Sequence, residues 1–287
     1  MLKGQGPYQI PRHPRMTVPA NATDCHFHIV GPQESYPFPP DKVYVPTEAL
    51  TSDYDTHVAP IGITRRVIVA TSAYRIDNRR IESALAEWGK HRTRAVATLG
   101  GAVTTAEISR LHDLGFRAVR IFEWIEGGNS LADLETLAAK VAPFGWHIEL
   151  CMSVEHLADL KARVRRLPAD VVFDHMGFLP VAVPMDHPGR TSLIELLGEG
   201  KCWVKLSCQY RLTAEGPPRY ADMVPIARAL IQANPDRVVW GTDWPHPMFQ
   251  GPLPNAGDLI DSIALWTDDP AIQRRILVDN PATLYDF

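Results

Sequence analysis

The chain lacks the features that mark membrane, secreted and nucleic-acid-binding proteins. No apolar run reaches the 18 residues that suggest a transmembrane helix, and the polar, proline-rich residues 1–19 do not resemble a secretory signal. Acidic and basic residues are mixed along the chain and give a net charge of −4, whereas nucleic-acid binders usually carry a basic patch. We therefore expect a cytoplasmic protein that binds neither membranes nor nucleic acids, and the sequence leaves open whether it forms a homo-oligomer.

Cysteine is also scarce, and none of the four residues forms a Cys-x-x-Cys pair. They stand at positions 25, 151, 202 and 208, and three of them lie in or beside apolar strand-like runs. This pattern favours reduced thiols in a protein core over disulfides or a thiolate metal site.

Several enzyme motifs are absent from the sequence. There is no Gly-x-Ser-x-Gly elbow, no P-loop and no His-Glu-x-x-His, which disfavours serine hydrolases, kinase-type enzymes and zincins. No Gly-x-Gly-x-x-Gly follows a strand, which removes the usual support for a nucleotide-binding open sheet.

What is present is a regular alternation of apolar, β-branched runs with amphipathic helical patterns. The chain has 287 residues, 45% of them hydrophobic, enough for one large domain. The predicted strands are 22–29, 66–71, 94–99, 117–122, 146–151, 170–175, 202–207 and 237–242. The predicted helices lie near 79–90, 105–115, 131–143, 154–166, 191–199, 219–234 and 271–278. Eight β/α repeats predict a (β/α)₈ TIM-type barrel formed as one domain by residues 1–287, with a doubly wound open sheet as the alternative.

Two stretches interrupt this alternation. Residues 31–63 form a proline-rich connection after the first strand, and residues 208–219 form another after the seventh. Both leave from carboxyl ends of strands, where a barrel carries its active site, so we expect them to be walls of a substrate site rather than decoration.

Four residues at strand ends carry the sharpest chemical signal. His26 and His28 are two apart and therefore point to one face of the first strand. His175 ends the sixth strand and Asp243 follows the eighth, and in a closed barrel these ends converge. Three imidazoles and a carboxylate suit Zn²⁺ or a similar divalent ion, which would generate a nucleophilic water near neutral pH. Without a metal the same groups could polarise a carbonyl and deprotonate water.

Further polar residues indicate an anionic substrate. Arg120, near the end of the fourth strand, is a candidate to bind a carboxylate with its bidentate guanidinium, and the alternative is an ion pair with Glu123 or Glu149. Arg211, in the loop after the seventh strand, could reach the same space or be a solvated charge. Candidate residues that bind or orient substrate are Tyr44, Ser72 and His246. The remaining histidines in helix or loop patterns are predicted to lie at the surface: His57, His91, His112, His147, His156 and His187.

These residues carry a resemblance to the amidohydrolase superfamily, in its amidohydrolase-2 branch. Within that branch the chain most resembles the 2-pyrone-4,6-dicarboxylate lactonases. The matching motifs are His26-Phe27-His28, Asp174-His175-Met176-Gly177, Arg211-Leu212 with Gly216-Pro217-Pro218, and Trp240 through Pro247. The resemblance spans nearly the whole chain and implies a distorted (β/α)₈ barrel.

The resemblance also implies roles. Asp243 would be the general base that activates water, and His26, His28 and His175 would polarise the lactone carbonyl or, with Asp243, hold a metal such as zinc. The substrate-binding positions are matched by Arg120, Arg211, Tyr44 and Ser72. The pyrone lactonases work without an obligatory metal, so both metal-dependent and metal-independent catalysis are consistent with the resemblance. The carbamylated lysine of other superfamily members is not evident, since neither the fourth nor the fifth strand contains a lysine.

Two departures from the pyrone lactonases concern the substrate. The run from Phe122 to Gly128 has no arginine where those enzymes carry one, and it gains two acids, Glu123 and Glu126. Cys151 replaces a tyrosine at the end of the fifth strand. A lost charge-assisted hydrogen bond costs on the order of 1.5–3 kcal/mol, so we expect a less charged or differently shaped ligand.

The sequence therefore predicts a lactonase that opens the ring of a small carboxylated lactone. The substrate would resemble 2-pyrone-4,6-dicarboxylate or a muconolactone and would arise in the breakdown of aromatic compounds or sugar acids. The alternatives are a lactone isomerase or a metal-dependent decarboxylase on the same scaffold, and a non-enzymatic ligand-binding barrel.

Overall fold

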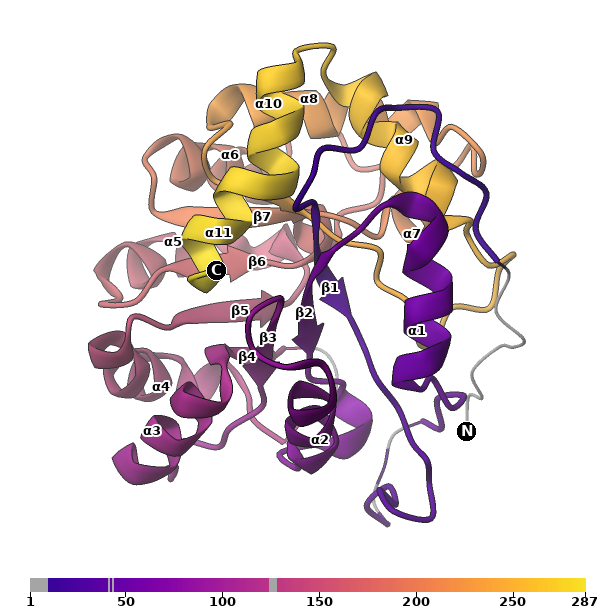
Figure 1. The fold of residues 1–287 in the computed structure, drawn as a ribbon. Coiled ribbons are helices and arrows are strands. Elements are labelled where there is room, and N and C mark those ends of the chain that lie inside the picture. The colour runs from indigo at the N-terminus through magenta and orange to yellow at the C-terminus, as the bar shows by residue number, and fades with distance from the viewer. Residues whose placement is uncertain (1–9, 41, 43, 124–127) are drawn as a thin grey trace.

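The computed structural model describes residues 10–40, 42, 44–123 and 128–287. Eight parallel strands follow one another in a nearly closed barrel, and helices cover its outside (Figure 1). The strands are β1 Thr23–Phe27, β2 Arg65–Val69, β3 Thr93–Ala97, β4 Phe116–Phe122, β5 His147–Cys151, β6 Val171–Phe173, β7 Cys202–Leu206 and β8 Val238–Trp240. The consecutive strand order confirms the predicted (β/α)₈ barrel and excludes a doubly wound sheet.

The helices confirm most of the predicted pattern and add to it. They are α1 Thr51–Val58, α2 Arg79–Trp88, α3 Thr105–Leu114, α4 Leu134–Val141, α5 Leu157–Arg166, α6 Pro188–Gly198, α7 Gln209–Leu212, α8 Val224–Ala233, α9 Ala256–Trp266, α10 Pro270–Arg274 and α11 Asn280–Tyr285. Helices α1 and α7 lie inside the two stretches that were predicted to be connections, 31–63 and 208–219, and helix α9 is absent from the prediction. Helix α1 escapes prediction because it is short and has only four buried residues, Thr51, Tyr54, His57 and Val58.

The barrel closes where β1 meets the segment after β8. The amide of Asp243 donates to the carbonyl of His26 (2.8 Å), and the amide of His28 donates to the carbonyl of Trp244 (2.7 Å). Gly241 allows this approach, because a Cβ there would lie 2.7 Å from the backbone nitrogen of His26. Asp24 joins the same two segments, since its carboxylate accepts hydrogen bonds from the amide and hydroxyl of Thr242 (2.9 and 2.6 Å).

Apolar side chains fill the barrel interior below the strand ends. A cluster that includes Val67, Val96 and Val239 is closed by Leu284 and Tyr285 from the carboxyl-terminal helix α11. This helix lies at the amino-terminal end of the barrel, because arginines at the beginnings of β3 and β4 bind the residues that end the chain, Tyr285 and Asp286. The interior is thus plugged at one end, and the other end is left for a site.

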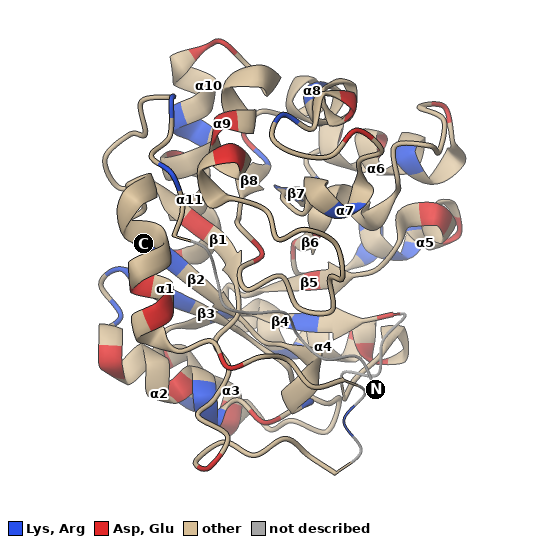
Figure 2. Cartoon of the chain, turned by 90° about the vertical axis from the view of Figure 1, so that its right-hand side faces the viewer, with Lys and Arg blue, Asp and Glu red and all other residues tan. Residues whose placement is uncertain are grey.

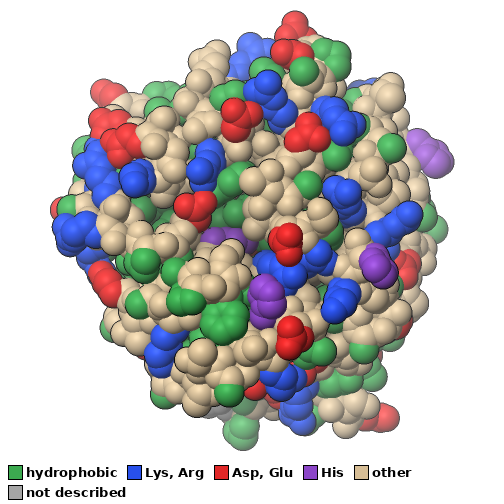
Figure 3. All heavy atoms as spheres, turned by 60° about the vertical axis from the view of Figure 1, so that its left-hand side comes forward, with side chains coloured by type: hydrophobic (Ala, Val, Ile, Leu, Met, Phe, Trp, Pro, Cys, Tyr) green, Lys and Arg blue, Asp and Glu red, His purple; other side chains and the backbone are tan. Residues whose placement is uncertain are grey.

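Positions of basic and acidic residues are spread along the outer helices (Figure 2). On the face shown in Figure 3 they are interspersed with small apolar groups. Within the described residues, no helix is both long and apolar enough to span a bilayer.

Candidate active site

The ends of three strands place three imidazoles around one carboxylate oxygen. His26 lies in β1, His28 follows β1, and His175 and Asp243 follow β6 and β8. The Nε2 atoms of His26, His28 and His175 lie 3.6, 3.5 and 3.8 Å from Oδ1 of Asp243. All four side chains are buried. The structure therefore brings together the quartet that the sequence singled out.

Two members of this quartet leave their strands through unusual backbone geometry. His175 has φ 55° and Asp243 has φ 58°, both in the left-handed region that residues other than glycine seldom adopt. Such conformations concentrate at functional sites, where surrounding structure holds them in place. Here the amide of Asp243 is tied to the carbonyl of His26, so the turn and the strand ends support each other.

A cavity of about 200 Å³ opens above the quartet. Its lining combines polar and charged groups with apolar groups. The lining residues are His28, Tyr44, Thr71, Ser72, Arg120, Phe122, Cys151, His175, Phe178, Arg211, Asp243, Pro247 and Met248. The combination of two guanidinium groups with an imidazole-rich floor suits a small anionic molecule.

Arg120 lines the cavity and is also ion-paired below it. Its guanidinium contacts Oδ2 of Asp174 through Nε (3.0 Å) and Nη2 (2.9 Å), and Nη1 donates to the carbonyl of Ala70 (3.0 Å). The alternative that paired Arg120 with Glu123 or Glu149 is wrong about the partner, since Asp174 takes that place. The ion pair holds the guanidinium in one orientation at the cavity wall.

Of the other predicted substrate-binding residues, three line the cavity and one does not. Arg211 has Nε 3.8 Å from Oδ2 of Asp243 and donates to the carbonyl of Pro247, so it is not a solvated loop charge. The hydroxyl of Tyr44 lies 2.5 Å from Oγ1 of Thr71, and Ser72 lies beside it on the cavity wall. His246 does not line the cavity; its ring packs at 4.9 Å against that of Tyr210.

The prediction that the remaining histidines lie at the surface is wrong for two of them. His57 is buried in α1 and packs at 5.7 Å against Trp244. His147 is buried in β5, inside the barrel, with Nε2 3.4 Å from Oε1 of Glu149. The local sequence pattern around each histidine does not show whether its side chain is covered. That depends on how helices and strands pack in the closed barrel.

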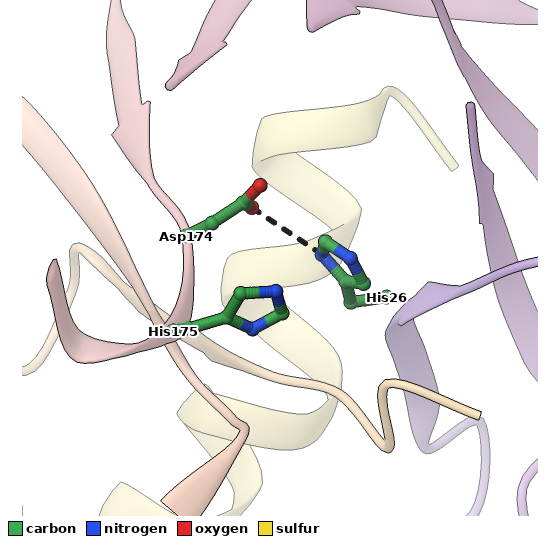
Figure 4. A group of neighbouring side chains, drawn as sticks. All are labelled: His26, Asp174 and His175. Atoms are coloured by element: carbon green, nitrogen blue, oxygen red, sulfur yellow. Dashed lines mark ion pairs between the residues drawn. The ribbon is translucent and has the colours of Figure 1, made fainter. Parts of the chain in front are cut away.

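Sequence reasoning missed a buried ionic layer directly beneath the quartet. Lys205 of β7 is fully buried, with Nζ 2.6 Å from Oε2 of Glu149, 3.3 Å from Oδ1 of Asp174 and 3.1 Å from Nδ1 of His26. Figure 4 shows Asp174 reaching the same edge of His26, with Oδ1 3.3 Å from Nδ1. The available signal was a lysine within the apolar run Cys202-Trp203-Val204-Lys205-Leu206, because a charge inside a strand that reads as buried needs a partner.

A second missed group holds the far oxygen of Asp243. The hydroxyl of Tyr210 donates a short hydrogen bond to Oδ2 of Asp243, and the thiol of Cys208 donates to the same oxygen at 3.4 Å. Oδ1 is thereby left to face the imidazoles and the cavity. Both residues stand in the loop 208–219, which had been expected to form a wall of the site.

The site combines a charged carboxylate, Asp243, with imidazoles at His26 and His175 whose pKa values are lowered by burial. Burial raises the pKa of Asp243, but His175, His28, His26 and Arg211 outweigh it and hold this pKa well below its usual value. Burial lowers the pKa of His175 to about 4, so its ring is neutral near pH 7. Burial raises the pKa of Cys151 to about 12, which leaves a thiol rather than a nucleophilic thiolate.

Three members of the quartet have the spacing of metal ligands. The ligand atoms of His26, His28 and Asp243 lie within 4.8 Å of one another, whereas the four residues together do not form such a group among the described residues. Four ligands about 2.0–2.1 Å from a tetrahedral ion stand roughly 3.3 Å apart, and Oδ1 of Asp243 lies 3.6 and 3.5 Å from Nε2 of His26 and His28. The Nε2 atom of His26 is buried and has no hydrogen-bond partner among the described residues, so it is open either to carry a proton or to bind an ion. His26, His28 and Asp243 are the residues that would hold an ion, with Nε2 of His175 3.8 Å from the same carboxylate oxygen.

Known proteins that are similar to this chain agree with the site described above. A family model described as amidohydrolase matches residues 23–287, and the chain belongs to this family. The 2-pyrone-4,6-dicarboxylate hydrolase of Comamonas testosteroni is 34% identical over 97% of this chain and 94% of its own length. The 4-sulfomuconolactone hydrolase of Hydrogenophaga intermedia is 30% identical over 94% of this chain and 90% of its own length.

A third relative and a solved structure extend the comparison. The D-galactarolactone isomerase of Agrobacterium fabrum is 28% identical over 95% of this chain and 93% of its own length. A crystal structure of an Agrobacterium tumefaciens protein, 26% identical, superimposes with a TM-score of 0.87 over 96% of this chain and 98% of that one. These findings confirm the predicted resemblance to the amidohydrolases.

The two predicted departures around the cavity have different outcomes. Phe122 and Cys151 both line the cavity, and Glu123 is exposed to solvent. Glu126 lies in residues 124–127, outside the described part of the chain. Phe122 and Cys151 thus place apolar groups beside Arg120 at the ends of β4 and β5.

Proposed function

We propose that this protein is a lactonase that opens the ring of a small carboxylated lactone. The observation that carries the proposal is the cavity, which is lined by Asp243, two imidazoles and two guanidinium groups. A third imidazole, that of His26, lies 3.6 Å from the same carboxylate oxygen. Relatives named for lactone hydrolysis and lactone isomerisation support the same substrate class. We further propose that the lactone arises in the breakdown of an aromatic compound.

Binding would rest on the two arginines and on two hydroxyl groups. A guanidinium donates two parallel hydrogen bonds to a carboxylate, which fixes orientation as well as position. Arg120 is held rigidly by Asp174, whereas Arg211 lies against Asp243 and Pro247. Tyr44 and Ser72 complete the polar wall, and Phe122, Cys151 and Met248 would contact the less polar face of the ring.

Hydrolysis would begin with a water between Asp243 and the ring carbonyl. As Asp243 takes a proton, the water oxygen bonds to the carbonyl carbon, and N–H groups of the cavity wall, such as the Arg211 guanidinium and His175 protonated on Nε2, would stabilise negative charge on the carbonyl oxygen. The ring C–O bond then breaks, and the released ring oxygen takes the proton from Asp243. The balance is one lactone plus one water giving one hydroxy acid or its keto tautomer. A divalent ion such as Zn²⁺ at the quartet would supply Lewis-acid polarisation when bound.

We propose that the protein works in the cytoplasm on a small molecule. All four cysteines are free and buried, as predicted, and free thiols suit the reducing cytoplasm. The small cavity and the mixed surface charge fit a small-molecule enzyme better than a binder of polymers.

A panel of carboxylated lactones tests this proposal. The wild-type protein is assayed with and without a chelator, each product is followed by NMR, and Asp243→Asn serves as the inactive control. Ring opening with uptake of one water supports a hydrolase, and ring migration without water uptake supports the isomerase alternative that the Agrobacterium fabrum relative favours. Absence of turnover for every lactone in the panel would overturn the proposed function.

A further inference from the structure

The three imidazoles that face Asp243 differ in what holds their other ring nitrogen. Nδ1 of His28 lies 2.8 Å from the carbonyl oxygen of Val69. A carbonyl can only accept, so the proton of neutral His28 sits on Nδ1 and Nε2 presents a lone pair to the site. Nδ1 of His175 lies 2.8 Å from the hydroxyl of Ser207, which can donate or accept and so permits either form.

His26 has the opposite arrangement to His28. Its Nδ1 is hydrogen-bonded to Nζ of Lys205 at 3.1 Å, and a lysine ammonium can only donate. Oδ1 of Asp174 is 3.3 Å from the same nitrogen, but it makes no hydrogen bond with any described residue. Nδ1 of His26 therefore accepts, and the ring proton lies on Nε2, the atom that faces Asp243.

Lys205 cannot easily turn away from this contact. Its ammonium is held by Glu149 at 2.6 Å and lies 3.3 Å from Asp174, and the side chain is fully buried. Glu149 is itself held by the hydroxyl of Tyr285 at 2.8 Å. Two carboxylates and one imidazole thus surround the ammonium within the closed barrel.

We propose that Lys205 is a positioning residue that fixes the Nε2–H form of His26. In this form the Nε2–H of His26, which does not line the cavity, points to Oδ1 of Asp243, 3.6 Å away, and orients this carboxylate toward the attacking water. His26 cannot at the same time offer Nε2 to a metal, because that nitrogen has no free lone pair, so the Lys205 contact weakens binding of a divalent ion at the quartet. The catalytic part rests on the proposed function, whereas the proton position and the metal affinity do not.

The test variant removes the buried ion pair as a unit. Lys205→Met alone would strand the Glu149 carboxylate in the core, so the variant is Glu149→Gln/Lys205→Met, in which Asp174 keeps its ion pair with Arg120. Lys201→Met, at an exposed lysine just before β7, is the matched control. Circular dichroism and thermal melting establish that each variant is folded.

Nitrogen-15 NMR of histidine-labelled protein reads the proton position directly. We expect the His26 signals of the wild type and of Lys201→Met to show Nε2 protonated and Nδ1 bare. In the double variant the proton should move to Nδ1, toward Asp174, while His28 stays protonated on Nδ1 throughout as an internal reference. A wild-type His26 with its proton on Nδ1 would overturn the proposal.

Zinc titration of the full chain gives a second, independent reading. Competition with a chromophoric chelator should show that the double variant binds Zn²⁺ at least tenfold more tightly than the wild type or Lys201→Met. Equal affinity in all three proteins would count against the proposal, even with a shifted NMR signal.

Steady-state kinetics then test the catalytic part on any lactone that the wild type hydrolyses. Loss of the Nε2–H that points to Asp243 should lower metal-free kcat at least tenfold while KM changes less than twofold. An unchanged kcat would refute the orienting role of His26. If no lactone is hydrolysed, the proposed function fails, and the NMR and zinc measurements still decide the role of Lys205.

Discussion

The two ends of the barrel interior are built by the same eight strands and filled in opposite ways. At the amino-terminal end, valines meet Leu284 and Tyr285 in an apolar plug. At the carboxyl end, the inward positions are charged and pair with one another, as Lys205 does with Glu149 and Arg120 with Asp174. A buried ion pair seldom adds stability relative to apolar packing. Apolar packing at the amino-terminal end therefore stabilises the fold. The carboxyl end retains buried charged groups that cost free energy and that a functional site needs.

Asp243→Asn should have the largest effect on function. The amide cannot take a proton from water, so we expect kcat on a lactone substrate to fall by about 10²–10⁴-fold. Circular dichroism and the unfolding midpoint should stay close to wild type, because Asn can still accept from Tyr210. A kcat within a few-fold of wild type would show that Asp243 is not the general base.

Leu284→Ala should have the largest effect on stability. Truncation of a buried leucine leaves a cavity, and we expect the free energy of unfolding to fall by about 2–5 kcal/mol. Urea denaturation measures the loss, and kcat/KM at a temperature where the variant is folded should be unchanged. A large loss of kcat/KM in a folded variant would mean that the plug and the site are coupled.

Asp24, at the seam between β1 and β8, should make stability depend on pH. Burial raises its folded-state pKa to about 6, despite hydrogen bonds from Thr242, His26 and Tyr54 that lower it. The folded protein thus holds this proton more tightly than the unfolded chain. The stabilisation it provides is present below pH 4 and disappears as the pH rises through 6, by up to about 3 kcal/mol.

Asp24→Asn isolates this contribution. An Asn oxygen can accept the two backbone amides, and its NH₂ can donate to the hydroxyls of Thr242 and Tyr54. Urea denaturation between pH 4 and 7 should therefore show a smaller fall in stability with rising pH for the variant than for wild type. Parallel curves for the two proteins would contradict the assignment.

Tyr210→Phe should have the smallest of the four effects. It removes a hydrogen bond to a charged carboxylate, worth about 1.5–3 kcal/mol, and leaves Oδ2 of Asp243 with Cys208 and Arg211. We expect kcat to fall by roughly 10–100-fold with little change in KM. A change confined to KM would show that Tyr210 binds the substrate and does not orient Asp243.

Much of this molecule could be predicted from its pattern of residues. Alternating apolar runs predict eight strands because a strand buried on both faces must be apolar along its length. His26, His28, His175 and Asp243 could be found because each stands at a strand end, and a closed barrel brings such ends together. Helices α1 and α9 were not found, since the first lies in a proline-rich stretch and the second is separated from β8 by the long connection 241–255.

The sequence by itself determined the strand order, the class of protein and the three imidazoles that lie around Asp243. Only the tertiary structure decided which partners those residues have. Lys205 and Tyr210 look like an isolated charge and a loop aromatic in the sequence, yet one contacts His26 and the other Asp243. The physical reason is that periodicity reports which face a residue takes, whereas ion pairs and hydrogen bonds depend on distances between strands far apart in the chain.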